Sequence, residues 1–119
     1  MMTETKNQLI EQRLRGHLEA VLGLPVVCER PAVVPTSFVL AERVGGGESI
    51  GLCTARFALQ SYAGSLLEAM QLNERVKQAM AGFAERDDIC RAELESDYNF
   101  TDPTTKRYRY QAVYQATYY

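Results

Sequence analysis

The stretch that decides the fold is the C-terminal one, Cys90 to Tyr118, which reads CRAELESDYNFTDPTTKRYRYQAVYQATY. Apolar and tyrosine side chains alternate with charged and amide side chains on both sides of Thr101–Thr105. That connecting segment contains the aspartate and proline typical of a turn. Alternation with a period of two predicts strands with one buried and one solvated face, so we expect an antiparallel hairpin here.

The length of the turn sets which residues lie opposite one another. If Thr101–Thr105 is the loop, Tyr98 lies opposite Tyr108 and Asp97 lies opposite Arg109. Opposite residues share a face of the sheet, so tyrosines meet tyrosines and acids meet bases. We expect the following tyrosines on one face beneath a helix layer: Tyr98, Tyr108, Tyr110, Tyr114 and Tyr118. Tyr119 falls outside that face and is a candidate for contact with another subunit.

The N-terminal half reads as one helix followed by three strands. Helical spacing of apolar residues predicts a helix from Thr3 to Leu22, which ends at Gly23. Short runs rich in apolar and β-branched residues predict three strands, at Leu24–Arg30, Ser37–Val44 and Ser49–Tyr62. We expect a flexible hairpin tip, and a candidate loop or interface, at the residues between the last two strands: Gly45, Gly46, Gly47 and Glu48.

A second helix begins after the third strand. Ser65 and Glu68 have the spacing of a capping box, in which the serine accepts a hydrogen bond from the amide three residues on. Leu66, Met70, Val76 or Lys77, Met80 and Phe83 give the expected helical stripe, which Asn73 interrupts. The element order is then helix, three strands, helix, two strands.

These elements predict the fold class. Two amphipathic helices packed on one face of a mainly antiparallel sheet of about five strands make a two-layer α+β domain. A chain of 119 residues without a linker or an internal repeat is expected to form a single domain, residues 1–119.

Composition excludes several classes of protein. With 46% hydrophobic and 24% charged residues, the chain has the make-up of a globular protein rather than a disordered one. We expect no membrane interaction, because no apolar run approaches the roughly 20 residues that span a bilayer. The polar N-terminal residues lack the apolar stretch of a signal peptide, so we do not expect secretion. The three cysteines have no C-x-x-C spacing, and we expect them to be reduced, partly buried thiols of an intracellular protein: Cys28, Cys53 and Cys90.

Motifs of catalysis, cofactor binding and metal binding are missing from the sequence. It has no G-x-S-x-G, H-E-x-x-H or phosphate-binding glycine loop, and its single histidine, His17, is expected at the solvated edge of the first helix. We therefore expect no enzyme activity, no cofactor and no metal. A net charge of −2 also disfavours binding to nucleic-acid phosphates.

Tyrosine use leaves three readings open. Trp is absent, yet there are seven Tyr, five of them within residues 108–119. They could stack on bases, form a subunit interface or fill the core. The alternation in the last hairpin favours the core.

Two segments carry a resemblance to a known family. The strand-to-helix passage Gln60–Ser65, continued by Glu68-Ala69 and Leu72–Val76, is the first. The ending Ser96–Phe100, Asp102 and Tyr108–Tyr114 is the second. Together with the element order, they resemble the small tail-terminator or tail-completion proteins of long-tailed bacteriophages and prophages.

The resemblance implies a structural, non-catalytic protein. Members of that family form rings, commonly hexameric, that cap the finished tail tube and provide the surface to which the head joins. It implies as partners the chain itself, the tail tube protein and head-neck proteins, with DNA passing through the lumen without specific binding. It places the protein in the cytoplasm of the bacterial host during assembly and afterwards in the tail or neck of the virion.

Other functions remain as alternatives. The first is another neck or minor tail structural protein. A second, from a different class, is a small-molecule-binding or enzymatic α+β domain with its site between the helix layer and the sheet. A third is a nucleic-acid-binding module that uses Tyr108, Tyr110, Tyr114, Arg107 and Arg109.

Overall fold

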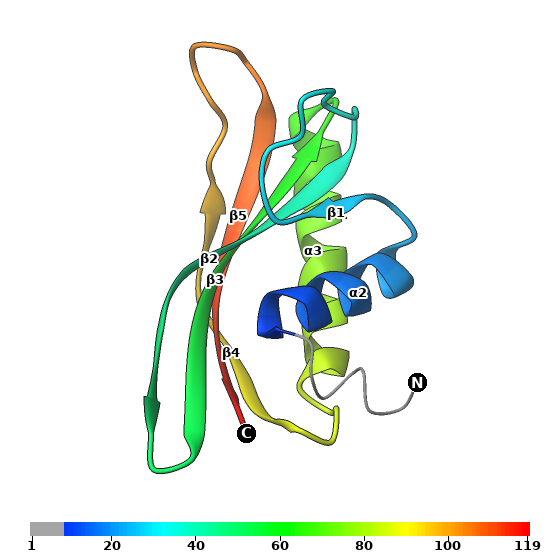
Figure 1. Ribbon diagram of the computed structural model, residues 1–119. Coiled ribbons are helices and arrows are strands. Elements are labelled where there is room, and N and C mark those ends of the chain that lie inside the picture. The colour runs from blue at the N-terminus through cyan, green and yellow to red at the C-terminus, as the bar shows by residue number, and fades with distance from the viewer. Residues whose placement is uncertain (1–8) are drawn as a thin grey trace.

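A computed structural model describes residues 9–119, in which two helices cover one face of a five-stranded sheet (Figure 1). The elements in chain order are α2 (Ile10–Leu22), β1 (Val26–Val27), β2 (Phe38–Ser49), β3 (Leu52–Ala63), α3 (Leu66–Phe83), β4 (Ile89–Asn99) and β5 (Tyr108–Tyr118). The strand order is β1-β2-β3-β5-β4, and every neighbouring pair is antiparallel except β1 with β2. The predicted two-layer α+β fold and its element order are confirmed.

Helix α2 ends where the sequence predicts. Gly23 has a φ of 68°, and its amide donates to the Glu19 carbonyl, which closes the last turn in the left-handed conformation that glycine adopts most easily. The buried stripe is Ile10, Leu14, Leu18 and Leu22. The predicted start at Thr3 lies outside the described residues.

Helix α3 begins at the predicted cap. The Ser65 hydroxyl oxygen accepts from the Glu68 amide at 3.2 Å, as expected, and the hydroxyl donates to the Glu68 carboxylate at 2.9 Å. The predicted stripe is wrong in its first half. Leu66 and Met70 are exposed, and the neighbouring helix positions Ala69 and Leu72 are buried instead. The residues that face the sheet are Ala69, Leu72, Asn73, Val76, Ala79, Met80 and Phe83.

The main core fills the space between the helices and the sheet. Side chains from both helices meet Phe57 and Leu59 of β3 and Ala112 and Tyr114 of β5, all of which are buried. Helix α3 packs on β3 and β5, and α2 packs on α3, β1 and β2. This arrangement makes β3 and β5 the covered centre of the sheet and leaves most of β2 and β4 as its edges.

The final hairpin forms, but its predicted register is wrong. Lys106 adopts a φ of 55°, and Asp102 pairs with Arg107, so the loop between the paired residues is shorter than expected. Tyr98 consequently lies opposite Gln111 and not opposite Tyr108. The register is displaced by an odd number of residues, so Tyr98 moves to the face away from the helices.

Further along β4, a β-bulge returns the side chains to the faces of the sheet that were predicted for them. The register shifts between Leu94 and Ser96, and Leu94 lies opposite Tyr114 on the helix side. The tyrosines of β5 that were predicted to lie beneath the helices do share that face: Tyr108, Tyr110, Tyr114 and Tyr118, which pair with the helix-facing residues Ala63, Ser61, Phe57 and Cys53 of β3.

Asp97 takes a different role from the predicted one. It lies opposite Ala112, on the helix side, and not opposite Arg109. Its carboxylate accepts from the Asn73 amide at 2.7 Å and from the Lys77 ammonium at 2.6 Å. The group links the outer strand β4 to helix α3 through charge-assisted hydrogen bonds.

The turn of the β2–β3 hairpin is also displaced. Gly45, Gly46, Gly47 and Glu48 were predicted to be a loop, but they lie within β2 and pair with Arg56, Ala55, Thr54 and Cys53 of β3. The chain reverses at Ile50 and Gly51 instead, with φ values of 50° and 78°. A two-residue turn with both φ values positive is of type I′, the geometry that matches the twist of a hairpin.

Removing the carboxylate that links β4 to α3 should destabilise the fold. We expect Asp97→Ala to lower the free energy of unfolding by about 1–3 kcal/mol, because the buried Asn73 amide loses its acceptor and Lys77 keeps only its exposed pair with Glu74. The control is Glu93→Ala on the same strand, whose exposed pair with Arg91 should contribute less than about 1 kcal/mol. Urea unfolding measures both, and equal losses would contradict the role of Asp97.

Alkaline pH should destabilise the protein through a buried tyrosine. Burial raises the pKa of Tyr114 above its ordinary value, so folding favours the protonated phenol. The resulting stability is present below the unfolded-state pKa of about 10 and is lost as the pH rises toward the folded-state pKa. We expect Tyr114→Phe to reduce the alkaline loss, measured as urea midpoints between pH 7 and 11. The same loss in both proteins would contradict this.

Candidate assembly surfaces

One edge of the sheet is open along most of its length. Strand β1 covers β2 only at Val39 and Leu40, so the segment from Ala41 to Ser49 is bonded to β3 on one side alone. Its side chains from Glu42 onward are exposed. It contains no proline or lysine, but its pairing is irregular between Arg43 and Gly45 and it carries the exposed charges Glu42, Arg43 and Glu48.

The glycine triplet occupies the middle of this edge. Gly46 approaches β3 so closely that a Cβ atom there would clash with the Thr54 carbonyl oxygen and the Arg43 guanidinium. Glycine is thus needed for packing within the hairpin. Gly45, Gly46 and Gly47 add no side chains of their own, and the Arg43 guanidinium lies over them and donates to the Gly45 carbonyl at 3.1 Å.

The turn at the end of the β2–β3 hairpin presents an apolar side chain to solvent. Ile50 is fully exposed, and Leu52 beside it is also exposed. A left-handed φ at a β-branched residue is a genuine outlier, because the branch crowds the backbone there. We call Ile50 and Gly51 the hairpin tip.

The opposite edge of the sheet is protected. Strand β4 is interrupted by irregularities in its pairing at Cys90 and Glu95, and it carries the exposed charges Arg91 and Glu93. Bulges and charges are the usual means of preventing strand addition. Tyr119, the predicted contact residue, lies next to this edge, exposed, with its amide donating to the Asp88 carbonyl.

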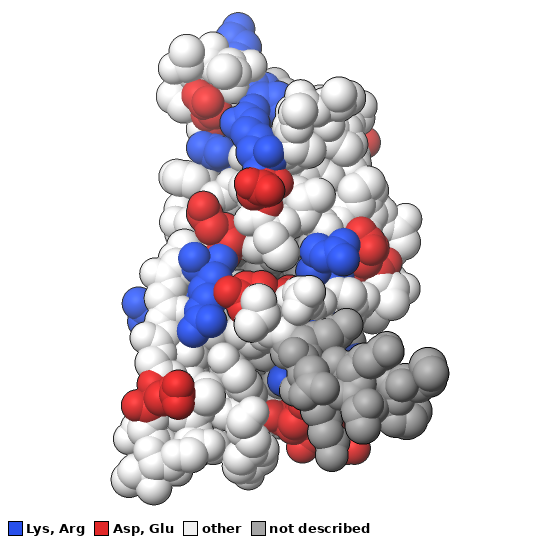
Figure 2. All heavy atoms as spheres, viewed as in Figure 1, with Lys and Arg blue, Asp and Glu red and all other residues white. Residues whose placement is uncertain are grey.

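Basic side chains gather at the β4–β5 loop end of the molecule (Figure 2). Two of them are committed to internal contacts. The Arg109 guanidinium donates to the Tyr62 hydroxyl at 2.8 Å and to the Phe100 carbonyl at 2.5 Å. Arg107 donates to the Pro35 carbonyl at 3.3 Å. These arginines hold the loops at this end of the sheet against one another.

A buried polar chain continues from Tyr62 across the face away from the helices. The Tyr62 hydroxyl donates to the side-chain oxygen Oε1 of Gln60 at 3.0 Å. The side-chain amide of Gln60 donates to Oε1 of Gln111 at 2.8 Å. The Gln111 amide in turn donates to the Tyr98 hydroxyl. The displaced register therefore gives Tyr98 a polar partner on this face.

This geometry does not bring together the residues of the nucleic-acid alternative. Arg109 lies on the Tyr62 face of the sheet, whereas Tyr110 and Tyr114 lie on the helix face. Strand alternation puts the aromatic rings and the arginines on opposite sides. A continuous basic and aromatic platform for bases does not form from this set.

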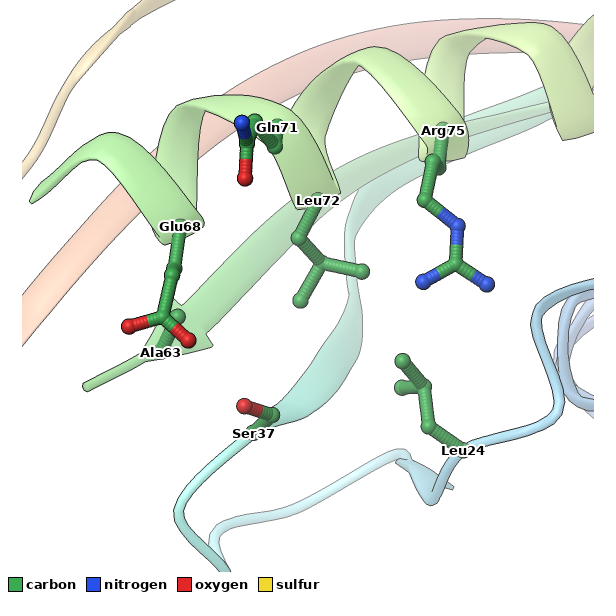
Figure 3. Close-up of a pocket in the computed structure, with 7 residues that line it drawn as sticks. All are labelled: Leu24, Ser37, Ala63, Glu68, Gln71, Leu72 and Arg75. Atoms are coloured by element: carbon green, nitrogen blue, oxygen red, sulfur yellow. The ribbon is translucent and has the colours of Figure 1, made fainter. Parts of the chain in front are cut away.

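A hollow between α3 and the start of β2 is where the small-molecule alternative would place its site (Figure 3). Its volume is about 200 Å³, and it is lined by Leu24, Ser37, Ala63, Glu68, Gln71, Leu72 and Arg75. Both charged groups already have local partners, because Glu68 accepts from Ser65 and Arg75 donates to the Leu22 carbonyl at 2.6 Å. Ligand pockets usually measure about 300–1,000 Å³, so this one is small for a metabolite.

The histidine and the cysteines differ from their predicted environments. His17 is half-buried between the helices, where its Nε2–H donates to the Ala79 carbonyl at 2.8 Å and its ring lies against Phe83. The cysteines are free thiols, with Cys28 and Cys90 exposed and Cys53 partly buried. Within residues 9–119, no group of three or more His, Cys, Asp or Glu side chains could hold a metal ion.

Comparison with known proteins adds no family assignment. No protein-family model matches the sequence, and a search of curated proteins finds no match. Neither helix of the described part of the chain has the length and apolarity needed to cross a membrane.

Arg109 should behave as a structural residue. We expect Arg109→Ala to lower the free energy of unfolding by about 1–3 kcal/mol, because two hydrogen bonds and its contact with the Phe100 ring are lost. Arg56→Ala is the control, since its pair with Glu95 is solvent-exposed and should contribute less than about 1 kcal/mol. Urea unfolding gives the comparison. Unchanged stability together with a loss of salt-sensitive DNA binding would instead support the nucleic-acid alternative.

Proposed function

We propose that the protein is a structural subunit of a phage or prophage tail, a tail terminator that assembles into a ring on the tail tube and forms the joint to the head. The observation that carries this proposal is the open β2 edge with its exposed hairpin tip. An open sheet edge and an exposed apolar tip favour association with another chain. The resemblance in Gln60–Val76 and in the last hairpin supplies the kind of assembly.

The architecture suits a ring subunit. A ring needs two different surfaces on each subunit, one for each neighbour, and a scaffold that holds them at a fixed angle. Here the two edges differ: the β2 edge ends in the exposed hairpin tip, whereas β4 is irregular at two places, and the helices pack on the strands between them. The subunit is thus asymmetric in the way that head-to-tail contact requires.

Charge fits the proposed passage of DNA. The chain has a net charge of −2, and two arginines at the β4–β5 end are engaged internally. A lumen formed by such subunits would not hold the phosphate backbone tightly, because tight binding depends on many free cations. We propose the tail tube protein and head-neck proteins as further partners, with assembly in the cytoplasm of the bacterial host and a final place in the virion.

The alternatives have less support. Another neck or minor tail protein would use the same edge and tip, and it differs only in where the ring sits. The enzymatic or ligand-binding alternative depends on the hollow beneath α3, whose charged side chains already have partners.

Self-assembly is the direct test. Light scattering after size-exclusion chromatography should show a closed oligomer of fixed stoichiometry over a range of protein concentrations. Added to isolated tail tubes, the protein should bind at one end and make them competent to join heads. A monomer at high concentration that also fails to bind tail tubes would overturn the proposal. A ring that binds heads but never tubes would favour the alternative neck protein.

A further inference from the structure

The hairpin tip is unfavourable for the isolated subunit in two respects. Ile50 adopts a φ of 50°, where β-branched residues are strained, and asparagine or glycine is strongly preferred at this position of a type I′ turn. Its side chain is also fully exposed to water. Strain that the fold does not require points to a function for that side chain.

A second surface feature is an open, mainly apolar hollow. A hollow of about 360 Å³ lies beside β1 and is lined mainly by apolar side chains: Val26, Val27, Cys28 and Pro31, with Arg15 and Glu29 also at its wall. Its volume exceeds that of an isoleucine side chain. We call it the β1 hollow.

We propose that the hairpin tip of one subunit inserts into the β1 hollow of a second copy of the chain, with Ile50 as the side chain that is buried there. This inference rests on the proposed function, because it names the contact between neighbouring ring subunits. The tip is the knob of the interface, and the hollow is its socket.

The arrangement of the subunit supports a second copy as the occupant. The tip lies at one end of the β2–β3 hairpin, whereas β1 pairs with β2 near the opposite end, at Val39 and Leu40 (Figure 1). The tip of a subunit therefore cannot fill its own hollow. A knob and a socket on different sides of one subunit give a head-to-tail contact, which generates rings when the rotation closes.

Charges around the two features are complementary. Glu48 precedes the tip, and Arg91 lies beside it across the adjoining surface. The β1 hollow has Arg15 and Glu29 at its wall, so each side offers one acid and one base. Arg15 is free to change partner, because its exposed contact with Glu19 spans 3.5 Å and contributes little.

Ile50→Asn separates association from folding. It creates the Asn-Gly sequence preferred in type I′ turns, so the free subunit should be at least as stable as the wild type in urea unfolding. We expect the association constant to fall at least about tenfold, as for loss of a central apolar contact. The control is Leu67→Asn, which removes an exposed apolar side chain of α3 and should leave association unchanged. Unchanged association in Ile50→Asn would overturn the inference.

Thiol cross-linking tests which surface receives the tip. Ile50→Cys is combined with Cys53→Ser and Cys90→Ser, so that the exposed Cys28 is the one native thiol left. Diamide then oxidises two thiols to a disulfide and takes up their two protons and two electrons. Burial raises the pKa of Cys28, so the reaction is run at about pH 9.

We expect covalent dimers and higher species that disappear when Cys28→Ser is added. Cross-links that persist in that variant would join two tips and would overturn the inference. If the Ile50→Asn variant forms the same ring as the wild type, the tip contact is refuted, whereas the proposed function is not. A wild type that remains monomeric and does not bind tail tubes would overturn both.

Discussion

The register between β4 and β5 is the constraint on which most of this structure depends. Lys106 in a left-handed conformation and the pairing of Asp102 with Arg107 set which side of β4 faces the helices. That choice directs Asp97 toward α3 and Tyr98 to the opposite face. Because side chains alternate along a strand, a displacement by an odd number of residues would exchange these two roles. The outer strand is thereby held on one face by a charge-assisted contact and on the other by a buried chain of amide and hydroxyl groups.

The same residues explain how far the sequence alone could go. Caps and regular alternation are local signals, so Gly23, the Ser65 cap and the facing of the β5 tyrosines follow from neighbours in the sequence. The facing of β4 depends on a bulge at Glu95 and on a single positive φ, which no periodic pattern contains. The β2–β3 turn escaped prediction because Ile50 is a residue type that such turns normally avoid, whereas the nearby glycines lie within the strand. The open edge of β2 could not be predicted from the sequence either. Whether a strand lies at an edge depends on which other strands pair with it, and its own residues do not give that pairing.

Polar and apolar surfaces have opposite uses in this subunit. The arginines of the nucleic-acid alternative are occupied within the fold, since Arg109 donates to the Tyr62 hydroxyl and Arg107 to the Pro35 carbonyl. Leaving a buried polar atom unpaired costs about 1–3 kcal/mol, so these groups are not free to engage a ligand without loss of stability. Among the described residues, the tip and the β1 hollow are apolar surface features, and the edge of β2 exposes backbone groups. Such features suit contact between protein chains better than binding of a charged polymer or a small polar substrate.

The distribution of knob and socket also bears on the form of an assembly. Each subunit has one tip and one β1 hollow, so in an open chain of subunits a strained, exposed tip remains at one end and an empty hollow at the other. In the proposed closed ring neither would remain, and every tip would be buried. Closure would then add one contact without the full entropic cost of bringing in another subunit, because both partners would already belong to the same assembly. The five-stranded sheet with its two helices would fix the angle between the proposed knob and socket, and that angle would determine how many subunits close the ring.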